Sequence, residues 1–349
     1  RIIRLDAIAY LCKQVGTSCI NLPQTHEVVK LLRDVLDMLA PDILLLTETN
    51  VPHAQNISYF GDADEARMVY QFSLPPLLLH ALHTGSSRYL SAWAASLQDP
   101  PAGCCFLNFS ASHDGIGVRP LEGLIADAEL QDLVDSIRKR GGHVSSYTRS
   151  DGSKSPYELN IGWYDALADP EHRDSDEHIA RFLCSQALVL ALKGIPAVYF
   201  HSLTATHNDA AGVQRSGQPR SINRKRWPAG ELNSLLDNPA TATSRVFHQY
   251  TRLLRLRAEH CAFHPDAAQR VLPLDDGLFG IERVSPDDTE RLLCINNLTA
   301  RQQQLNAAQF GPAPAEHEWH DLIEGQNHII DDDIGLTLQP WQTVWLSIA

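Results

Sequence analysis

The sequence lacks three features, and each absence excludes a class of protein. No Cys-x-x-Cys pair occurs among its seven cysteines, which argues against a structural zinc site or a redox dithiol. There is no excess of positive charge: the formal net charge is −13, so nucleic acid and anionic membranes are not expected as partners. No long apolar run occurs either. The longest, Ala187 to Leu192, stops at Lys193, whereas a membrane span needs roughly 20 residues.

The cysteines indicate the cellular compartment of the protein, and the first residues indicate whether the chain is part of a longer one. The cysteines are odd in number and scattered, and several lie in apolar runs, as is typical of reduced thiols in a core. We therefore expect a cytoplasmic protein, and no signal peptide is visible. The chain begins inside an apolar strand, Arg1 to Leu5, without an initiator Met. We expect it to be the C-terminal part of a longer protein.

Strand-like and helical patterns alternate from residue 1 to about residue 260, and two-residue alternation dominates after Pro265. Apolar strands between helices predict an α/β fold with a parallel sheet covered on both faces. We interpret residues 1–264 as the C-terminal part of a (β/α)8 barrel, strands 4 to 8 with the first three missing, and 265–349 as a small antiparallel β domain. The strands expected in the first part are 2–5, 43–46, 68–72, 106–109 and 194–200, and those in the second part include 278–283, 290–297 and 343–348. The expected helices are 26–39, 77–83 and 176–192, and 141–155 is expected to be a loop.

Three carboxylates follow predicted strands: Asp6, Glu48 and Asp114. Their separations exceed the roughly 30 residues of a strand–helix–strand unit, so all three are expected at one edge of the sheet. Sugar-transferring enzymes use a nucleophile, a proton donor and a group that holds the sugar as positive charge develops. We assign Asp6 as nucleophile, kept ionised by Arg4 on the same side of the strand. Glu48 becomes the acid/base, and Asp114 with His113 grips sugar hydroxyls.

Each of these residues also has a purely structural interpretation. Asp6 and Arg4 can form a stabilising ion pair at a strand end, and Glu48 can favour a helix start through the helix dipole. His113-Asp114-Gly115 can be a tight turn, with Gly115 and Gly117 leaving room for a ligand in the alternative view. The joint pattern is more specific than its parts, because all three structural explanations would have to coincide at barrel spacing.

These stretches resemble conserved regions of the α-amylase superfamily, glycoside hydrolase family thirteen. Within it, the chain is similar to the sucrose phosphorylase subfamily and, in two stretches, to its glucosylglycerate phosphorylase branch. The residues that carry the resemblance are Arg4–Ala7, Gly16–Cys19, Glu48–His53, Phe72–Leu82, Ser112–Gly123, Gly194–Tyr199 and Arg220–Arg224.

The resemblance implies a retaining, double-displacement phosphorylase that releases α-glucose 1-phosphate from a small glucoside such as glucosylglycerate or sucrose. Its partners would be a sugar and inorganic phosphate, with no cofactor and no metal. The resemblance places Tyr10 at the phosphate, and Tyr157 and Glu158 on a mobile acceptor loop. Arg220 or Arg224 would hold the donor glucose.

Two positions depart from the family pattern. Asn50 stands where sucrose phosphorylases usually carry His, and Glu158 stands where Gln is common. Both differences concern the acceptor and phosphate side. An anionic acceptor would need a cation nearby, for which Arg119, Arg215 and His53 are candidates, although each fits a surface role equally well.

Two other functions remain open. A hydrolase or transglucosidase of the same superfamily would share all three carboxylates. A binding module or inactive fragment is the third interpretation, and we expect the chain alone to be inactive because the resemblance assigns further sugar-binding residues to the missing strands. The acceptor and the oligomeric state are not readable from the sequence.

Overall fold

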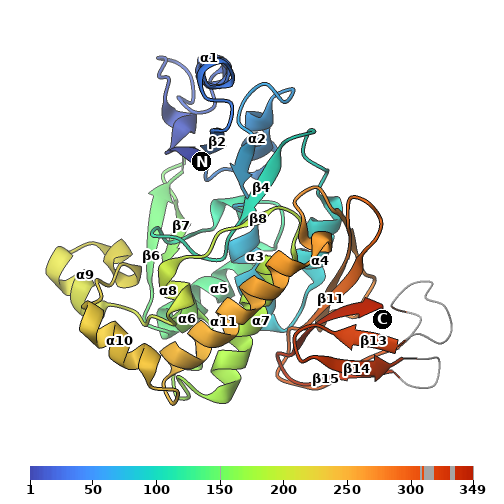
Figure 1. The fold of residues 1–349 in the computed structure, drawn as a ribbon. Coiled ribbons are helices and arrows are strands. Elements are labelled where there is room, and N and C mark those ends of the chain that lie inside the picture. Colours follow the sequence, from blue (N-terminus) through green and yellow to red (C-terminus); the bar gives the residue numbers. More distant parts are fainter. Residues whose placement is uncertain (150, 307–308, 310–317, 331–334, 349) are drawn as a thin grey trace.

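The computed structural model describes residues 1–149, 151–306, 309, 318–330 and 335–348. A parallel sheet and its helices form one part of the molecule, and an antiparallel sheet lies at the side near the C-terminus (Figure 1). The N-terminal strand and helix lie at the opposite end of the view from that second sheet. The predicted order of an α/β part followed by an antiparallel β part is confirmed.

The parallel sheet has five strands in the described part of the chain, in the order β1-β2-β3-β4-β8. Each strand pairs with the next in parallel register, as when Leu5 lies opposite Thr47. All strands therefore end at one edge of the sheet, where Asp6 and Glu48 follow β1 and β2. The bounds are β1 Ile2–Leu5, β2 Leu44–Thr47, β3 Met68–Tyr70, β4 Cys105–Asn108 and β8 Ile195–Pro196.

Helices connect the strands. The long helices α7 and α11 pack against each other, and α7 also packs against the second sheet. The bounds are α1 Pro23–Leu39, α2 His53–Ile57, α3 Leu74–Thr84, α4 Arg88–Ser96, α5 Asp127–Lys139, α6 Trp163–Ala166, α7 Asp176–Ala191, α8 Phe200–Leu203, α9 Ala210–Ser216, α10 Ala229–Asp237 and α11 Ala242–Glu259. The five 3₁₀ helices of the described residues are Ile8–Tyr10, Ser58–Phe60, Arg119–Leu121, Pro219–Asn223 and Cys261–Phe263.

Several predicted elements have different limits in the structure, and two of the differences have a clear physical reason. The helix expected after the prolines begins before them, at Leu74, because the first-turn N–H groups of a helix have no intrahelical partner and Pro75 and Pro76 lose nothing there. The strand expected at 194–200 is only the two residues of β8. Tyr199 then caps α8, so the chain turns into a helix at the sheet edge.

The prediction of a loop at 141–155 is wrong. Residues His143–Thr148 form β6, Lys154–Asn160 form β7, and the two pair as a hairpin to which β5, Ile116–Gly117, adds a third strand. The glycines that indicated a loop lie at its ends: Gly142 precedes β6, and Gly152 turns between the strands with φ near +83°. Tyr157 and Glu158 therefore lie in a strand and not on a loop.

The antiparallel part contains a six-stranded sheet in the order β14-β13-β16-β11-β10-β9 and a two-stranded pair, β12-β15. The expected strands at 278–283, 290–297 and 343–348 are all found. Whether the predicted boundary near residue 264 separates independent domains stays a prediction. The bounds are β9 Ala268–Val271, β10 Leu278–Val284, β11 Arg291–Asn297, β12 Gln303–Leu305, β13 Glu318–Asp321, β14 Gln326–Ile329, β15 Leu336–Leu338 and β16 Thr343–Ile348.

Two surface features follow from this arrangement. Strand β1 is an edge of the parallel sheet, and its Ile2 and Ile3 are exposed. Helix α1 also exposes apolar side chains, among them Leu31 and Met38. Among the described residues, no helix is both long and apolar enough to cross a membrane.

A buried arginine joins the two parts of the molecule. Arg283, in β10, has no solvent-exposed surface. Its guanidinium donates to three backbone carbonyl oxygens: Ala191 at the end of α7 (2.7 Å), His264 (2.9 Å) and Ala268 at the start of β9 (3.2 Å). Burial lowers its pKa to about 10, so it remains charged at neutral pH. The three hydrogen bonds fix the second sheet against the helical layer.

We expect Arg283→Met to destabilise the protein. Methionine retains much of the side-chain volume but leaves three carbonyl groups without this donor, at a cost of about 2 to 4 kcal/mol in the free energy of unfolding. Urea denaturation followed by circular dichroism measures the change. Arg255→Met, at an exposed position of α11, is the matched control and should stay within about 0.5 kcal/mol of the parent. Equal loss in both variants would contradict the role of Arg283.

Candidate functional site

The candidate site is a pocket at the edge where the parallel strands end. It contains Glu48 after β2 and His113 and Asp114 in the turn that follows β4. Residues of strands β5 and β7 and of the 3₁₀ helix Pro219–Asn223 form its other side. The lining residues of the described chain are Arg4, Glu48, Asn50, Tyr70, Phe72, Pro75, Phe109–Gly117, Tyr157, Glu158, Ile161, Arg220 and Asn223.

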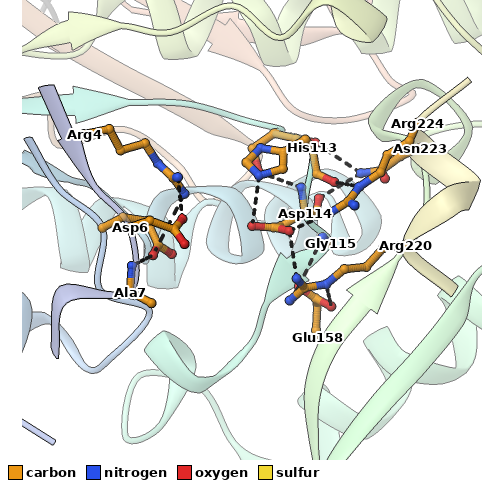
Figure 2. Close-up of polar contacts among 12 residues, drawn as sticks. Arg4, Asp6, Ala7, His113, Asp114, Gly115, Glu158, Arg220, Asn223 and Arg224 are labelled. Carbon is orange, nitrogen blue, oxygen red and sulfur yellow. Dashed lines mark hydrogen bonds and ion pairs between the residues drawn. The ribbon is translucent and has the colours of Figure 1, made fainter. Parts of the chain in front are cut away.

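On one side, Arg4 contacts both Asp6 and Glu48. Figure 2 shows the side chains of Arg4 and Asp6 pointing toward one another. Arg4 Nη1 donates to Asp6 Oδ1, and Arg4 Nη2 lies 3.9 Å from Glu48 Oε2. The N–H of Ala7 donates to the same Glu48 oxygen at 2.7 Å. Ala7 has a left-handed backbone, with φ 46°, which turns the chain sharply after Asp6. The neighbouring strands β1 and β2 thus place both carboxyl groups on one guanidinium.

The two carboxyl groups have different environments. The Asp6 side chain is 71% exposed, whereas that of Glu48 is only 16% exposed. Burial raises the pKa of Glu48, and the negative charges of Asp6 and Asp114 raise it further, against the lowering effects of the Ala7 N–H and Arg4. A carboxyl group that holds its proton to higher pH suits a proton donor, and a solvated carboxylate beside an arginine suits a nucleophile.

Across the pocket, two arginines hold Asp114. Arg220 Nη1 and Arg224 Nη2 each lie 2.9 Å from Asp114 Oδ1. Arg224 also donates to the backbone carbonyl of His113, and Asn223 donates to the carbonyl of Asp114 at 2.8 Å. His113 Nε2 lies 3.6 Å from the other Asp114 oxygen. The segment that carries these arginines therefore fixes both the backbone and the carboxylate of Asp114.

Glu158 supports Arg220 from behind, in a role the sequence did not predict. Its side chain is 4% exposed and receives two hydrogen bonds from the Arg220 guanidinium, both at 2.9 Å. It also accepts the N–H of Gly115 at 3.2 Å. With both oxygens engaged within the protein, Glu158 is a support for Arg220 and the Asp114 turn.

The glycines of the Asp114 turn make room for protein side chains and not directly for a ligand. A Cβ on Gly115 would lie 2.6 Å from Cγ of Glu158. A Cβ on Gly117 would lie 2.4 Å from Nδ2 of Asn50, which itself lines the pocket. The two departures from the family pattern, Asn50 and Glu158, thus both pack against this turn.

An aromatic cluster forms another wall, which the sequence interpretation missed. Tyr70 and Phe72 stack with ring centroids 5.3 Å apart, and Phe109 meets both rings edge-on. Arg4 lies over the Tyr70 ring, 5.8 Å from its centroid. A low-dielectric wall of this kind strengthens electrostatic interactions in the pocket. The signal was present in the sequence, since Tyr70 and Phe72 lie at the end of one predicted strand and Phe109 is the last residue of another.

The remaining predicted residues divide between the pocket and the surface. Tyr157 is a lining residue, whereas Tyr10, 42% exposed, is not among them. Of the candidate cations for an acceptor, Arg119 packs over Tyr147, and His53 lies beside Phe106. Arg215 lies outside the pocket, near Asp209. None of these three candidates lines the pocket in the described part of the chain.

A second cluster of charged residues, His207, Asp165 and Asp174, lies next to the segment that carries Arg220 and Arg224. His207 contacts Asp165 through Nδ1 (2.7 Å) and Asp174 through Nε2 (3.2 Å). The buried Asp165 also accepts the N–H of Asn208 at 2.8 Å, and the next residue, Asp209, donates its N–H to Ile222. This clamp ties α6 to the segment bearing Arg220 and Arg224. Among the described residues, no group of three or more His, Cys, Asp or Glu is arranged to hold a metal ion.

We expect Glu158→Gln to destabilise the protein and to loosen Arg220. Glutamine has the same shape but replaces one acceptor oxygen by an amide donor and removes the charge, at a cost of about 1 to 3 kcal/mol. Urea denaturation measures the loss. The control is Glu122→Gln, which breaks an exposed ion pair with Arg119 and should cost less than about 1 kcal/mol. An unchanged free energy of unfolding in Glu158→Gln would refute the supporting role.

The His207 clamp should make stability pH-dependent. Hydrogen bonds to Asp165 and then Asp174 raise the pKa of His207 to about 9 from its ordinary 6.5. Because the raised pKa belongs to the folded state, the stabilisation is complete below pH 6.5 and is lost as pH rises through about 9. Thermal melts across this range should show a decline that His207→Gln removes. The control, exposed His248→Gln, should retain the decline. Identical profiles for the parent and His207→Gln would contradict this expectation.

Comparison with known proteins connects this geometry to a family. Glucosylglycerate phosphorylase of Escherichia coli (strain K12) is 41% identical over 345 residues, which are 99% of this chain and 60% of that protein. Sucrose phosphorylase of Bifidobacterium adolescentis is 30% identical over 249 residues, 68% of this chain and 46% of that protein. No family model matches the chain.

The solved structures agree. Sucrose 6F-phosphate phosphorylase from Thermoanaerobacter thermosaccharolyticum superposes with a TM-score of 0.71 and 25% identity, over 85% of this chain and 56% of that one. The chain spans about 60% of the length of the glucosylglycerate phosphorylases it matches. Since these alignments run over 99% of the chain, they give no support to the expectation that the chain alone is inactive.

The resemblance predicted from the sequence is confirmed. The homologues of this chain are glucosylglycerate phosphorylases and, further away, sucrose phosphorylases, within the α-amylase superfamily.

Proposed function

We propose that this chain carries the catalytic centre of a retaining α-glucoside phosphorylase. The observation that carries the proposal is the contact of both Asp6 and Glu48 with the Arg4 guanidinium, while Arg4, Glu48 and Asp114 line one pocket. Retaining enzymes need two carboxyl groups about 5 to 5.5 Å apart, and a shared guanidinium favours such a short separation. The names of the homologues point to the same reaction class.

In the first step, Asp6 attacks the anomeric carbon of an α-glucoside. The bond to the leaving-group oxygen breaks as Glu48 gives that oxygen a proton, and a glucosyl-enzyme ester remains. In the second step, a phosphate oxygen attacks the same carbon, Glu48 takes the phosphate proton, and Asp6 leaves as a carboxylate. The product is α-glucose 1-phosphate. Asp114, held by Arg220 and Arg224, binds hydroxyls of the glucose ring, and His113 contributes a second polar group.

The aromatic wall borders the pocket near the buried Glu48, whereas Asp6 is open to solvent. Tyr157 is placed to contact the acceptor, because it lines the pocket beside the Asp114 turn. Asn50, which also lines the pocket, would contact the acceptor as well. Tyr10 would reach the bound phosphate only by turning inward from its exposed position.

Further parts of the proposal concern fold, substrate and compartment. The five parallel strands would be strands 4 to 8 of a (β/α)8 barrel, and residues 265–349 would form a separate domain. The substrate would be glucosylglycerate or sucrose, with glycerate or fructose as the leaving group. We place the enzyme in the cytoplasm on the basis of its free thiols. A hydrolase or transglucosidase with the same carboxylates is the alternative.

The test is phosphate release from α-glucose 1-phosphate in the presence of glycerate, fructose, fructose 6-phosphate or glycerol. We expect release with one of these acceptors. Glu48→Gln should slow it at least about 100-fold, since it removes general acid–base catalysis. Asp6→Asn should abolish it, since no nucleophile remains.

Asp132→Asn, at an exposed position of α5, is the control and should react as the parent does. Glucose formation in place of acceptor glucoside would favour the hydrolase. No turnover with any acceptor, or full activity in Asp6→Asn, would overturn the proposal.

A further inference from the structure

A strongly basic segment lies outside the catalytic pocket. Residues 210–230 contain no Asp or Glu, although the whole protein has a net charge of −13. Positive charge is therefore concentrated in this segment, although the protein as a whole is negatively charged. Such a local concentration of positive charge is how an acidic protein attracts anions. The cations of the segment are Arg215, Arg220, Arg224, Lys225 and Arg226.

The fold gathers four of these cations around a second cavity. The cavity has a volume of about 680 Å³ and lies between α9, the 3₁₀ helix Pro219–Asn223 and the start of α10. Two hydroxyl groups, Ser216 and Ser221, also line it and hydrogen-bond each other at 2.7 Å. The charged lining residues are Arg215, Arg224, Lys225 and Arg226, with Asp209 and Glu231.

The carboxylates of the cavity do not balance its cations. Asp209 lies 3.4 Å from Arg215, and Glu231 lies 3.3 Å from Lys225. Within the described part of the chain, Arg226 makes no side-chain hydrogen bond and no ion pair. One guanidinium therefore faces the cavity region without a counter-charge, and the Arg215 pair is long and exposed, so it holds that guanidinium weakly.

Arg224 links this cavity to the catalytic pocket. It lines the cavity, and its Nη2 bonds to Asp114 in the pocket at 2.9 Å. Figure 2 shows Arg224 reaching Asp114 from the side opposite Arg4. An anion held beside Arg224 would thus lie next to the catalytic pocket without occupying it.

We propose that this cavity binds a small oxyanion, an inorganic phosphate or a carboxylate, before it enters the catalytic pocket. Guanidinium groups present planar pairs of N–H donors that match the oxygens of phosphate and carboxylate, and the two serine hydroxyls can donate as well. That the bound anion is then consumed in the reaction rests on the proposed function, which uses phosphate or a carboxylate-bearing acceptor. That the cavity binds an anion does not depend on the proposed function.

Trp227 gives a local reporter of occupancy. Its ring lies over Lys225, with Nζ 3.4 Å from the centroid, and its indole N–H donates to Thr206 at 3.0 Å. The protein has six tryptophans, so the indole N–H signals are few, and Trp227→Phe assigns the relevant one. No tryptophan is among the described residues that line the catalytic pocket. A shift of the Trp227 signal therefore reports on the basic cavity.

The experiment titrates the full chain with inorganic phosphate and, separately, with glycerate while the indole signals are recorded by NMR. We expect saturable shifts at Trp227. Arg226→Ala should weaken binding roughly threefold, and Arg215→Ala with Arg226→Ala roughly tenfold, as expected for exposed charge pairs. Arg255→Ala, on exposed α11, removes the same charge and should bind as the parent does. Circular dichroism confirms that each variant is folded.

Each outcome decides the proposal. Shifts with both anions support one oxyanion site, and shifts with only one of them support the site and identify its ligand. Absence of shifts with both anions, or binding by the double variant as tight as the parent's, overturns the proposal. Glu48→Gln should bind the anion normally while its turnover falls, as both proposals expect. Anion binding by a parent protein that shows no turnover with any acceptor would count against the proposed function alone.

Discussion

The hold of two arginines on one carboxylate is the interaction on which the site depends. Arg220 and Arg224 both contact the same oxygen of Asp114, from a segment more than a hundred residues further along the chain. Without them, the Asp114 turn would be an exposed Asp-Gly turn with several accessible conformations. With them, Asp114 faces the pocket that also holds Glu48, and the two sides of the site keep a fixed relation.

Carboxylates outside the pocket hold Arg220 and the segment that carries Arg220 and Arg224. Glu158, buried in β7, accepts hydrogen bonds from Nε and Nη2 of Arg220. The contacts of His207 with Asp165 and Asp174 fix the chain just before the segment that carries the two arginines. Charges in the pocket are therefore placed by charges outside it. In the proposed reaction, this arrangement would reduce the reorganisation needed when positive charge develops on a bound sugar, which is how preorganised electrostatics lower a barrier.

The distribution of charge over the chain supports the same view. A protein with a net charge of −13 repels anions on average, yet the proposed reaction consumes one. The segment 210–230 concentrates positive charge beside the pocket, and two of its arginines contact the pocket carboxylate Asp114. One short stretch of chain thus serves both the orientation of Asp114 and the local attraction of anions.

The sequence on its own determined the parallel sheet and the edge at which Asp6 and Glu48 lie. Apolar runs that alternate with helical periodicity predicted the parallel sheet, and the position of Asp6 and Glu48 directly after adjacent strands predicted that they would meet at one edge. Local pattern suffices there, because parallel register carries strand ends to the same place. The motif around Arg220 and Arg224 was also recognisable, although its partners were not.

The tertiary structure alone decided the rest. Glycines at 141–142 and 152 indicated a loop, but they are the ends of a hairpin whose pairing with β5 is not local. For the same reason, the sequence predicts Glu158 as a substrate contact on a loop, whereas its position in β7 buries it against Arg220. The aromatic wall of Tyr70, Phe72 and Phe109 and the His207 clamp likewise depend on contacts between distant segments. Sequence pattern reports local periodicity and turn chemistry, whereas which charge meets which is settled only when the whole chain has packed.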